Sequence, residues 1–128
     1  MKTSYDVLIV GTGIAGLSAA LALPKSLSVL IVSKDYAWEC NTFYAQGGVA
    51  VAKDDNDIPV HINDTLDAGA GHCNLEAVKV LCSEGPLAIQ RLINMGFNFD
   101  KDEHGNLLYT KEAAHSTNRI LHAGGDAT

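Results

Sequence analysis

The chain has 128 residues, 47% of them hydrophobic, which is enough for one globular core and too apolar for a disordered segment. Its formal net charge of -6, without any run of Lys or Arg, excludes the basic surface on which non-specific nucleic-acid binding depends. No stretch has the length of a membrane-spanning helix and the first residues lack the pattern of a signal peptide, so we expect a soluble cytoplasmic protein without a membrane partner.

The cysteines and the acidic residues predict no metal site. Cys40, Cys73 and Cys82 are odd in number and form no CxxC pair, a spacing that fits neither a disulfide framework nor a structural zinc site. We expect three free thiols. The acidic stretch at residues 53–57 lacks the oxygen-ligand register and the closing glutamate of an EF-hand, so we interpret it as a solvated turn before Pro59.

The N-terminal residues predict a β-α-β unit. Residues 6–10 are a short β-branched and apolar run, which is typical of a buried parallel strand. Residues 14–23 are small or aliphatic and end before Pro24, which predicts a helix. Residues 28–32 repeat the strand pattern, so the three elements together have the length of a Rossmann-like crossover.

The next segments predict a loop and further helices. Residues 35–52 are too irregular for one strand or one helix, and we expect them to form an ordered, functional loop. Helical periodicity covers residues 62–70, 75–82 and 86–94, with Asn74 as an N-cap and a Gly-Pro pair that separates the last two helices.

The C-terminal part predicts short strands. Residues 97–100 alternate between apolar and polar side chains like a strand, and a turn at 103–106 leads into another strand at 107–109. We therefore predict an α/β fold, in which a Rossmann-like β-α-β unit with additional helices forms an incomplete part of a larger dinucleotide-binding domain.

A glycine-rich motif lies between the first predicted strand and the first predicted helix. Gly11 permits a tight turn, Gly13 lets the backbone approach a pyrophosphate, and Gly16 lets the helix pack closely on the sheet. The N-terminus of the helix attracts phosphate groups. The predicted dinucleotide site comprises Gly11, Thr12, Gly13, Ile14, Ala15 and Gly16.

The end of the second predicted strand departs from the usual pattern. An acidic residue commonly holds the adenosine ribose there, but this chain has Ser33 and Lys34. Lys34 is compatible with a 2′-phosphate, and hence with NADP, and equally with a solvated lysine at a strand end. The spacing alone does not choose between these two interpretations.

The segment at residues 41–48 resembles the succinate dehydrogenase/fumarate reductase flavoproteins and the L-aspartate oxidases. The same superfamily commonly has a Ser-Lys or Thr-Lys pair at the position of Ser33-Lys34. The resemblance implies a larger FAD/NAD(P)-binding domain with FAD as its cofactor, bound by Ser33, Lys34 and by Asn41, Thr42, Phe43, Tyr44, Ala45, Gln46, Gly47 and Gly48. The two glycines allow backbone amides to approach the flavin, and the Thr42 hydroxyl and the Gln46 amide are polar groups able to orient it.

Asn41 distinguishes two branches of this superfamily. In the respiratory enzymes a histidine at this position carries a covalent bond to the flavin. Asparagine cannot make that bond, so the resemblance implies FAD that is bound non-covalently, as in the L-aspartate oxidases. The usual form of the segment in those oxidases has Gly-Ser where this chain has Cys40-Asn41.

Residues 64–71, 111–116 and 119–124 resemble the L-aspartate oxidases in particular. By this resemblance Glu112 is a catalytic-site residue that orients the α-ammonium group of the substrate, a role for which a carboxylate is chemically suited. His115 is a second catalytic candidate, since it and His122 could transfer protons, pair with a metal, or hydrogen-bond backbone or flavin-site groups. No carboxylate or cysteine follows at ligand spacing, so we expect no metal there. Arg119 has two possible roles: it could contact a phosphate or carboxylate of a ligand, or it could form an ion pair with an acidic residue in the same domain.

The resemblance implies the FAD-dependent oxidation of L-aspartate to iminoaspartate, with oxygen or fumarate as acceptor. The product would serve quinolinate and NAD biosynthesis, with quinolinate synthase as a partner. Residues 1–128 would be the N-terminal part of the FAD-binding domain, with the capping and C-terminal helical domains beyond Thr128, so we expect this segment alone to be inactive; its abrupt end at residues 124–128 fits such a boundary. The alternatives are a flavoprotein subunit of fumarate reductase or succinate dehydrogenase type, and a non-catalytic nucleotide-binding module.

Overall fold

The computed structural model describes residues 4–125, which divide after Ala45 into two compact units. Residues 1–3 and 126–128, which include most of the chain end interpreted above as a boundary, lie outside the described residues. Cys40, Cys73 and Cys82 are all unpaired.

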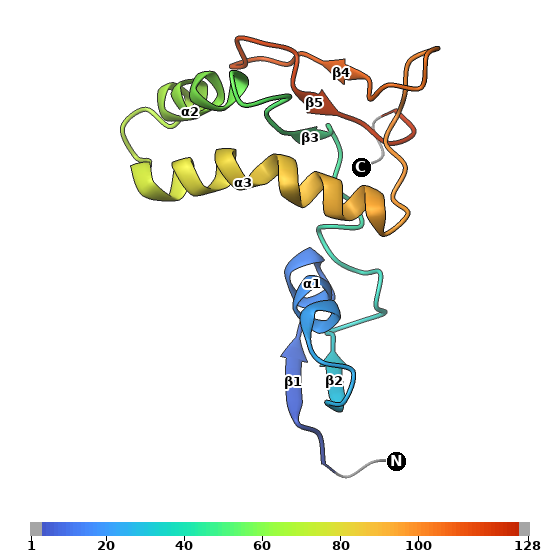
Figure 1. The fold of residues 1–128 in the computed structure, drawn as a ribbon. Helices are drawn as coiled ribbons and strands as arrows, with labels where there is room; N and C mark the ends of the chain where they lie inside the picture. Colours follow the sequence, from blue (N-terminus) through green and yellow to red (C-terminus); the bar gives the residue numbers. More distant parts are fainter. Residues whose placement is uncertain (1–3, 126–128) are drawn as a thin grey trace. The chain divides into compact units, whose positions relative to one another are not determined.

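The first unit is a β-α-β crossover, as the sequence predicts. Strands β1 (Val7–Val10) and β2 (Val29–Val32) lie side by side in parallel register, with Val7 opposite Val29, and helix α1 (Ile14–Ala22) connects them (Figure 1). Both strands have the sequence Val-Leu-Ile-Val, whose β-branched residues favour extended backbone. The Gly11 amide extends the ladder by donating to the Val32 carbonyl at 2.8 Å.

The two strands leave much apolar surface uncovered within the described residues. Val10 is 79% exposed and Leu8 is 60% exposed, and Leu17 and Leu21 of α1 are exposed as well. Parallel sheets are normally covered on both faces. The exposed faces of β1 and β2 are therefore typical of two strands from a larger sheet. The parallel strands and the helix between them confirm the predicted α/β class.

The second unit combines two helices with a small antiparallel sheet. Helices α2 (Asp57–Ala68) and α3 (Leu75–Asn94) pack against each other. The strands β3 (Val49–Ala50), β4 (Tyr109–Thr110) and β5 (Ile120–Leu121) follow the order β3-β5-β4 (Figure 1).

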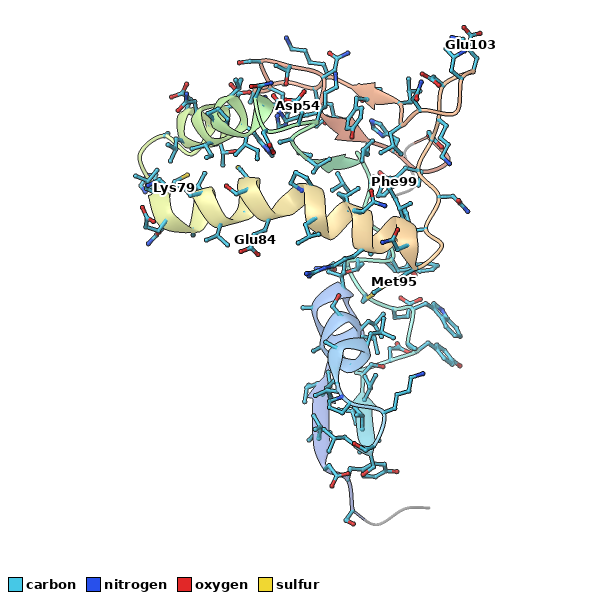
Figure 2. The ribbon with its side chains drawn as sticks, viewed as in Figure 1. Asp54, Lys79, Glu84, Met95, Phe99 and Glu103 are labelled. Atoms are coloured by element: carbon cyan, nitrogen blue, oxygen red, sulfur yellow. The ribbon has the colours of Figure 1, made fainter. Side chains whose placement is uncertain are left out.

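The core of the second unit lies between α3 and the sheet. Val51, Ile89, Phe99 and Leu121 form its buried centre. Figure 2 shows Phe99 close to the end of α3 and Glu84 on the side of that helix away from the strands. Side chains from α3, from β5, from the residue after β3 and from the loop at Phe99 therefore bury one another.

Helix α3 is continuous, so the predicted break at Gly85-Pro86 is wrong. Proline inside a helix removes one hydrogen bond and costs about 3 kcal/mol. The buried residues Val78, Cys82 and Ile89 lie on both sides of the proline and make one apolar face. A Cβ built on Gly85 would lie 3.4 Å from Val51 Cγ2, so the Gly-Pro step itself packs against the core. The tertiary packing of this face outweighs the local preference for a break.

Two further expectations need correction. Helix α2 begins at Asp57 rather than near residue 62, and Asp57 is buried instead of lying in a solvated turn. Residues 97–100 form no strand, because Phe97 and Phe99 pack ring against ring at 4.7 Å and Phe99 enters the core. The predicted Asn74 cap is confirmed, since its side chain accepts the Ala77 amide at 3.0 Å.

Candidate functional site

The glycine turn in the first unit has the backbone that its sequence predicts. Gly11 has a φ of +105°, which L-residues rarely adopt. A Cβ on Gly16 would lie 2.3 Å from the Gly11 carbonyl oxygen, so only glycine lets the helix approach the turn this closely. Gly13 is the N-cap residue of α1 and is extended, with φ of -69° and ψ of 175°.

The N-terminus of α1 retains amides that could bind an anion. Gly13 supplies no side-chain cap, and the amides of Gly13 and Ala15 have no acceptor among residues 4–125. The Ile14 amide donates to Thr42 Oγ1 at 3.1 Å. A helix N-terminus combines unpaired N–H groups with the positive end of the helix dipole, so a pyrophosphate suits the amides of Gly13 and Ala15.

Thr42 therefore caps α1 and joins residues 41–45 to the glycine turn. Its Oγ1 lies 3.3 Å from the position of a Cβ on Gly13, which leaves little space for a larger residue there. The Cys40 thiol makes a second, weaker link by donating to the Thr12 carbonyl at 3.8 Å. Sequence reasoning assigned the Thr42 hydroxyl to the flavin and missed this capping contact.

The other predicted cofactor residues of the first unit are exposed. Ser33 Oγ donates to the Asp35 carbonyl, while Lys34 and Asn41 lie at the surface. Phe43 and Tyr44 pack edge to face. The Tyr44 hydroxyl donates to Glu39 at 2.7 Å, and this hydrogen bond raises the pKa of Tyr44.

Gly47 and Gly48, in the second unit, differ in the space around them. Both have positive φ values, +90° and +86°. A Cβ on Gly48 would collide with Ile120 and with the Leu121 carbonyl at 2.8 Å, so Gly48 is required by the close contact with β5. Within residues 4–125, a Cβ on Gly47 would meet nothing within 4 Å, so packing does not require a glycine there.

Glu112 lies in a tight turn at residues 111–116. Its side chain is exposed and has no hydrogen-bond or ion-pair partner in the described part of the chain. Lys111 Nζ closes the turn by donating to the Ser116 carbonyl at 3.1 Å. Glu112 is thus an uncommitted carboxylate on an ordered segment.

Arg119 is the centre of a buried ionic cluster in the second unit. The side chain is 0% exposed and donates from Nη2 to Asp57 Oδ1 at 2.8 Å and from Nε to Asp57 Oδ2 at 3.2 Å. Its Nη1 donates to Asp64 Oδ2. Arg119 therefore forms an ion pair within the domain, which is the second of the two roles that its sequence position allows.

This cluster keeps both carboxylates charged. Hydrogen bonds from Arg119 lower the pKa of Asp57 to about 2, and hydrogen bonds from Ser116 and then Arg119 lower the pKa of Asp64. His61, on the same face of α2, is buried, and its Nδ1 has no hydrogen-bond partner among the described residues; burial lowers the pKa of His61.

The two candidate histidines take part in internal hydrogen bonds. His115 Nδ1 lies 3.1 Å from Arg119 Nη1. Because guanidinium can only donate, Nδ1 accepts, and the proton of the neutral ring is on Nε2. His122 Nε2 lies 2.8 Å from Thr110 Oγ1.

No group of three or more His, Cys, Asp or Glu side chains within residues 4–125 is arranged to hold a metal ion. Among the helices of that same stretch, none combines the length and the hydrophobicity that crossing a bilayer requires.

Residues 6–128 match the protein family described as FAD binding domain. The match covers nearly all of the chain, so the chain belongs to this family, and FAD is the cofactor of the domain. The glycine turn and the amides at the start of α1 fit its pyrophosphate, which agrees with this assignment.

The chain is similar over its length to L-aspartate oxidases. It is 48% identical over 123 residues to L-aspartate oxidase of Clostridium acetobutylicum, covering 96% of this chain and 28% of that protein. The identity with L-aspartate oxidase of Streptomyces coelicolor is 48% over 125 residues, covering 96% of this chain and 22% of that protein. The chain thus spans about a quarter of the length of these curated relatives.

A solved structure with a similar fold is Mycobacterium smegmatis Sdh1 in complex with UQ1. The TM-score is 0.85 with 31% sequence identity, covering 97% of this chain and 21% of that chain. In both kinds of comparison the chain aligns with less than a third of a longer protein.

Proposed function

We propose that this chain is the FAD-binding part of an enzyme that oxidises L-aspartate to iminoaspartate. The observation that carries the proposal is the 48% identity to proteins named L-aspartate oxidase along 123 residues. The identity to the Sdh1 structure over a similar length is 31%. The chain is therefore more similar in sequence to these L-aspartate oxidases than to Sdh1.

In the first unit, we assign the FAD pyrophosphate to the amides of Gly13 and Ala15. This assignment is supported by their lack of other acceptors in the described residues and by the helix dipole behind them. Asn41 cannot carry a histidyl bond, which supports non-covalent FAD. When bound, FAD supplies the acceptor for the hydride that leaves the aspartate Cα.

In the second unit, we assign Glu112 to the α-ammonium group of aspartate. A free, exposed carboxylate is an appropriate partner for an ammonium ion, and it would disfavour a dicarboxylate without one. We assign His115 the role of a donor through Nε2, because its Nδ1 is engaged by Arg119. Gly47, with open space beside it, is the candidate for a backbone contact to the flavin.

The finer parts of this proposal concern the whole enzyme. Oxygen or fumarate would reoxidise the flavin, and iminoaspartate would enter quinolinate and NAD biosynthesis in the cytoplasm. Quinolinate synthase is the partner that would consume it. The capping and C-terminal helical domains would complete the substrate site around residues 1–128.

A flavoprotein subunit of succinate dehydrogenase or fumarate reductase type is the second candidate, and the TM-score of 0.85 to Sdh1 favours it. The two candidates differ in the substrate. Aspartate carries an α-ammonium group for Glu112 to bind, whereas succinate carries none.

A spectroscopic titration distinguishes the candidates. The full-length protein, meaning the complete gene product that contains these residues, would be purified with FAD and titrated without oxygen. We expect L-aspartate, and not succinate, to bleach the flavin absorbance. Bleaching by succinate alone would favour the respiratory type, and absence of bound flavin would favour a nucleotide-binding module.

A further inference from the structure

The turn that carries Glu112 has an unusual backbone. Ala114 has a φ of +67°, a left-handed conformation that residues other than glycine seldom adopt. The His115 amide donates to the Glu112 carbonyl at 3.3 Å and closes the turn from inside. Backbone conformations of this kind persist only where the surrounding structure holds them.

Asp64, on α2, holds the end of this turn. Its carboxylate accepts the Ser116 amide at 2.7 Å and the Ser116 hydroxyl at 2.6 Å. The two residues are 52 positions apart in the sequence, so this is a tertiary anchor and not a local turn contact. Two hydrogen bonds to one charged carboxylate form a strong link.

Arg119 also holds Asp64, and its buried guanidinium is directed at residues of the second unit. Its three nitrogens donate to Asp57, Asp64 and His115, and its side chain is completely buried. Any influence of Arg119 on a substrate must therefore pass through the turn or through His115.

We infer that Asp64 and Ser116, supported by Arg119, are positioning residues that hold Glu112 in place for the α-ammonium group of aspartate. The inference rests on the proposed function of Glu112. An exposed carboxylate on a mobile turn would lose conformational freedom when it binds a cation, and a turn that is already ordered avoids that cost. The anchor therefore contributes to aspartate binding without touching aspartate.

Ser116→Ala tests this inference in the full-length protein with FAD bound. The variant loses one hydrogen bond to Asp64 and keeps the backbone one. We expect the KM for L-aspartate to rise about three- to tenfold while kcat stays within about twofold. The inhibition constant of succinate, which lacks the ammonium group, should not change, whereas a general distortion of the site would weaken both ligands.

Thr117→Val is the matched control. Thr117 belongs to the same cluster, but its hydroxyl donates to Asp57 at 2.7 Å and not to the residue that holds the turn. This variant should leave the ratio of aspartate KM to succinate inhibition constant as in the wild type. Glu112→Gln gives the benchmark: it should raise the aspartate KM, and it should not weaken succinate inhibition, because succinate no longer faces a negative charge there.

The results separate the inference from the function on which it rests. If Glu112→Gln changes the ratio and Ser116→Ala does not, the positioning role is wrong and the role of Glu112 stands. If Glu112→Gln leaves the ratio unchanged, both are wrong. A change of the ratio in Ser116→Ala and Glu112→Gln, but not in Thr117→Val, supports the inference.

Discussion

Replacing Gly16 by alanine tests whether the close approach of α1 to the glycine turn is needed for FAD binding. The new Cβ would lie 2.3 Å from the Gly11 carbonyl oxygen and 3.3 Å from Ile9 Cγ2. Carbon–oxygen contacts usually stay at about 3.3 Å or more, so the helix and the turn must separate by about 1 Å. The nearest group is backbone, which cannot rotate aside as a long side chain can.

Two effects on stability oppose each other in this variant. Alanine is favoured over glycine in a helix by about 1 kcal/mol, and overpacking costs about 1–3 kcal/mol. Because the clash is with backbone, we place its cost in the upper part of that range. The unfolding free energy of the apoprotein should therefore fall by about 1–2 kcal/mol.

The effect of Gly16→Ala on FAD binding should be larger. A shift of about 1 Å takes the Gly13 and Ala15 amides out of hydrogen-bond distance from a phosphate held by the rest of the site. Weakening two charge-assisted hydrogen bonds should raise the Kd for FAD about tenfold or more. Quenching of flavin fluorescence during titration of the apoprotein measures this Kd.

Ser18→Ala is the control, since Ser18 is exposed on the same helix. It should bind FAD with wild-type affinity. If Gly16→Ala binds FAD as tightly as Ser18→Ala does, the reasoning about the turn is refuted.

Three further changes test separate contacts. Thr42→Val removes the acceptor of the Ile14 amide, so urea denaturation of the apoprotein should show a loss of about 1 kcal/mol; an unchanged midpoint would contradict the capping role. Ala114→Gly removes the strain of a left-handed alanine, which stabilises the fold by about 1–2 kcal/mol, while the greater freedom of glycine in the unfolded chain costs about 0.5–1 kcal/mol. The unfolding temperature should therefore rise, and a fall would argue against strain at this position. Because Arg119 lowers the pKa of Asp57 from 3.8 to about 2, the stability from this pair is complete above pH about 4 and is lost as the pH falls toward 2. Urea unfolding should show a loss of about 1–2 kcal/mol over this range, and Asp57→Asn should lack that part of the acid transition; an identical transition in the variant would count against the pair.

The β-α-β unit could be predicted because its signals are local. Two identical apolar runs, the glycines at 11, 13 and 16, and Pro24 all act within about one helical turn or one strand of their own position. The Asn74 cap is local for the same reason. In these places the preferences of neighbouring residues and the final fold agree.

The continuity of α3 could not be predicted from the preferences of its own residues. Gly85-Pro86 favours a break, and the apolar face that overrides it becomes visible only when Val51 and the sheet are present. The alternation at residues 97–100 misleads for the same reason, because Phe99 is held by contacts in the core and not by a neighbouring strand.

The sequence indicates an acidic partner for Arg119 as one of two roles, but it does not indicate which residues form the buried cluster. Asp57 and Arg119 lie 62 positions apart, and no local sequence pattern links the two residues. One signal was available, because Asp57, His61 and Asp64 follow the spacing of one helix face. A polar stripe of that kind, with no basic partner on its own helix, predicts a buried cation from elsewhere in the chain.

The central claim is that the start of α1 holds the pyrophosphate of FAD, and a structure of the full-length protein with FAD bound tests it most directly. The distances from the Gly13 and Ala15 amides to the nearest phosphate oxygens are the quantities to measure. We predict that both lie at about 2.7–3.2 Å. Phosphates bound elsewhere, or a protein side chain occupying those amides, would contradict the account.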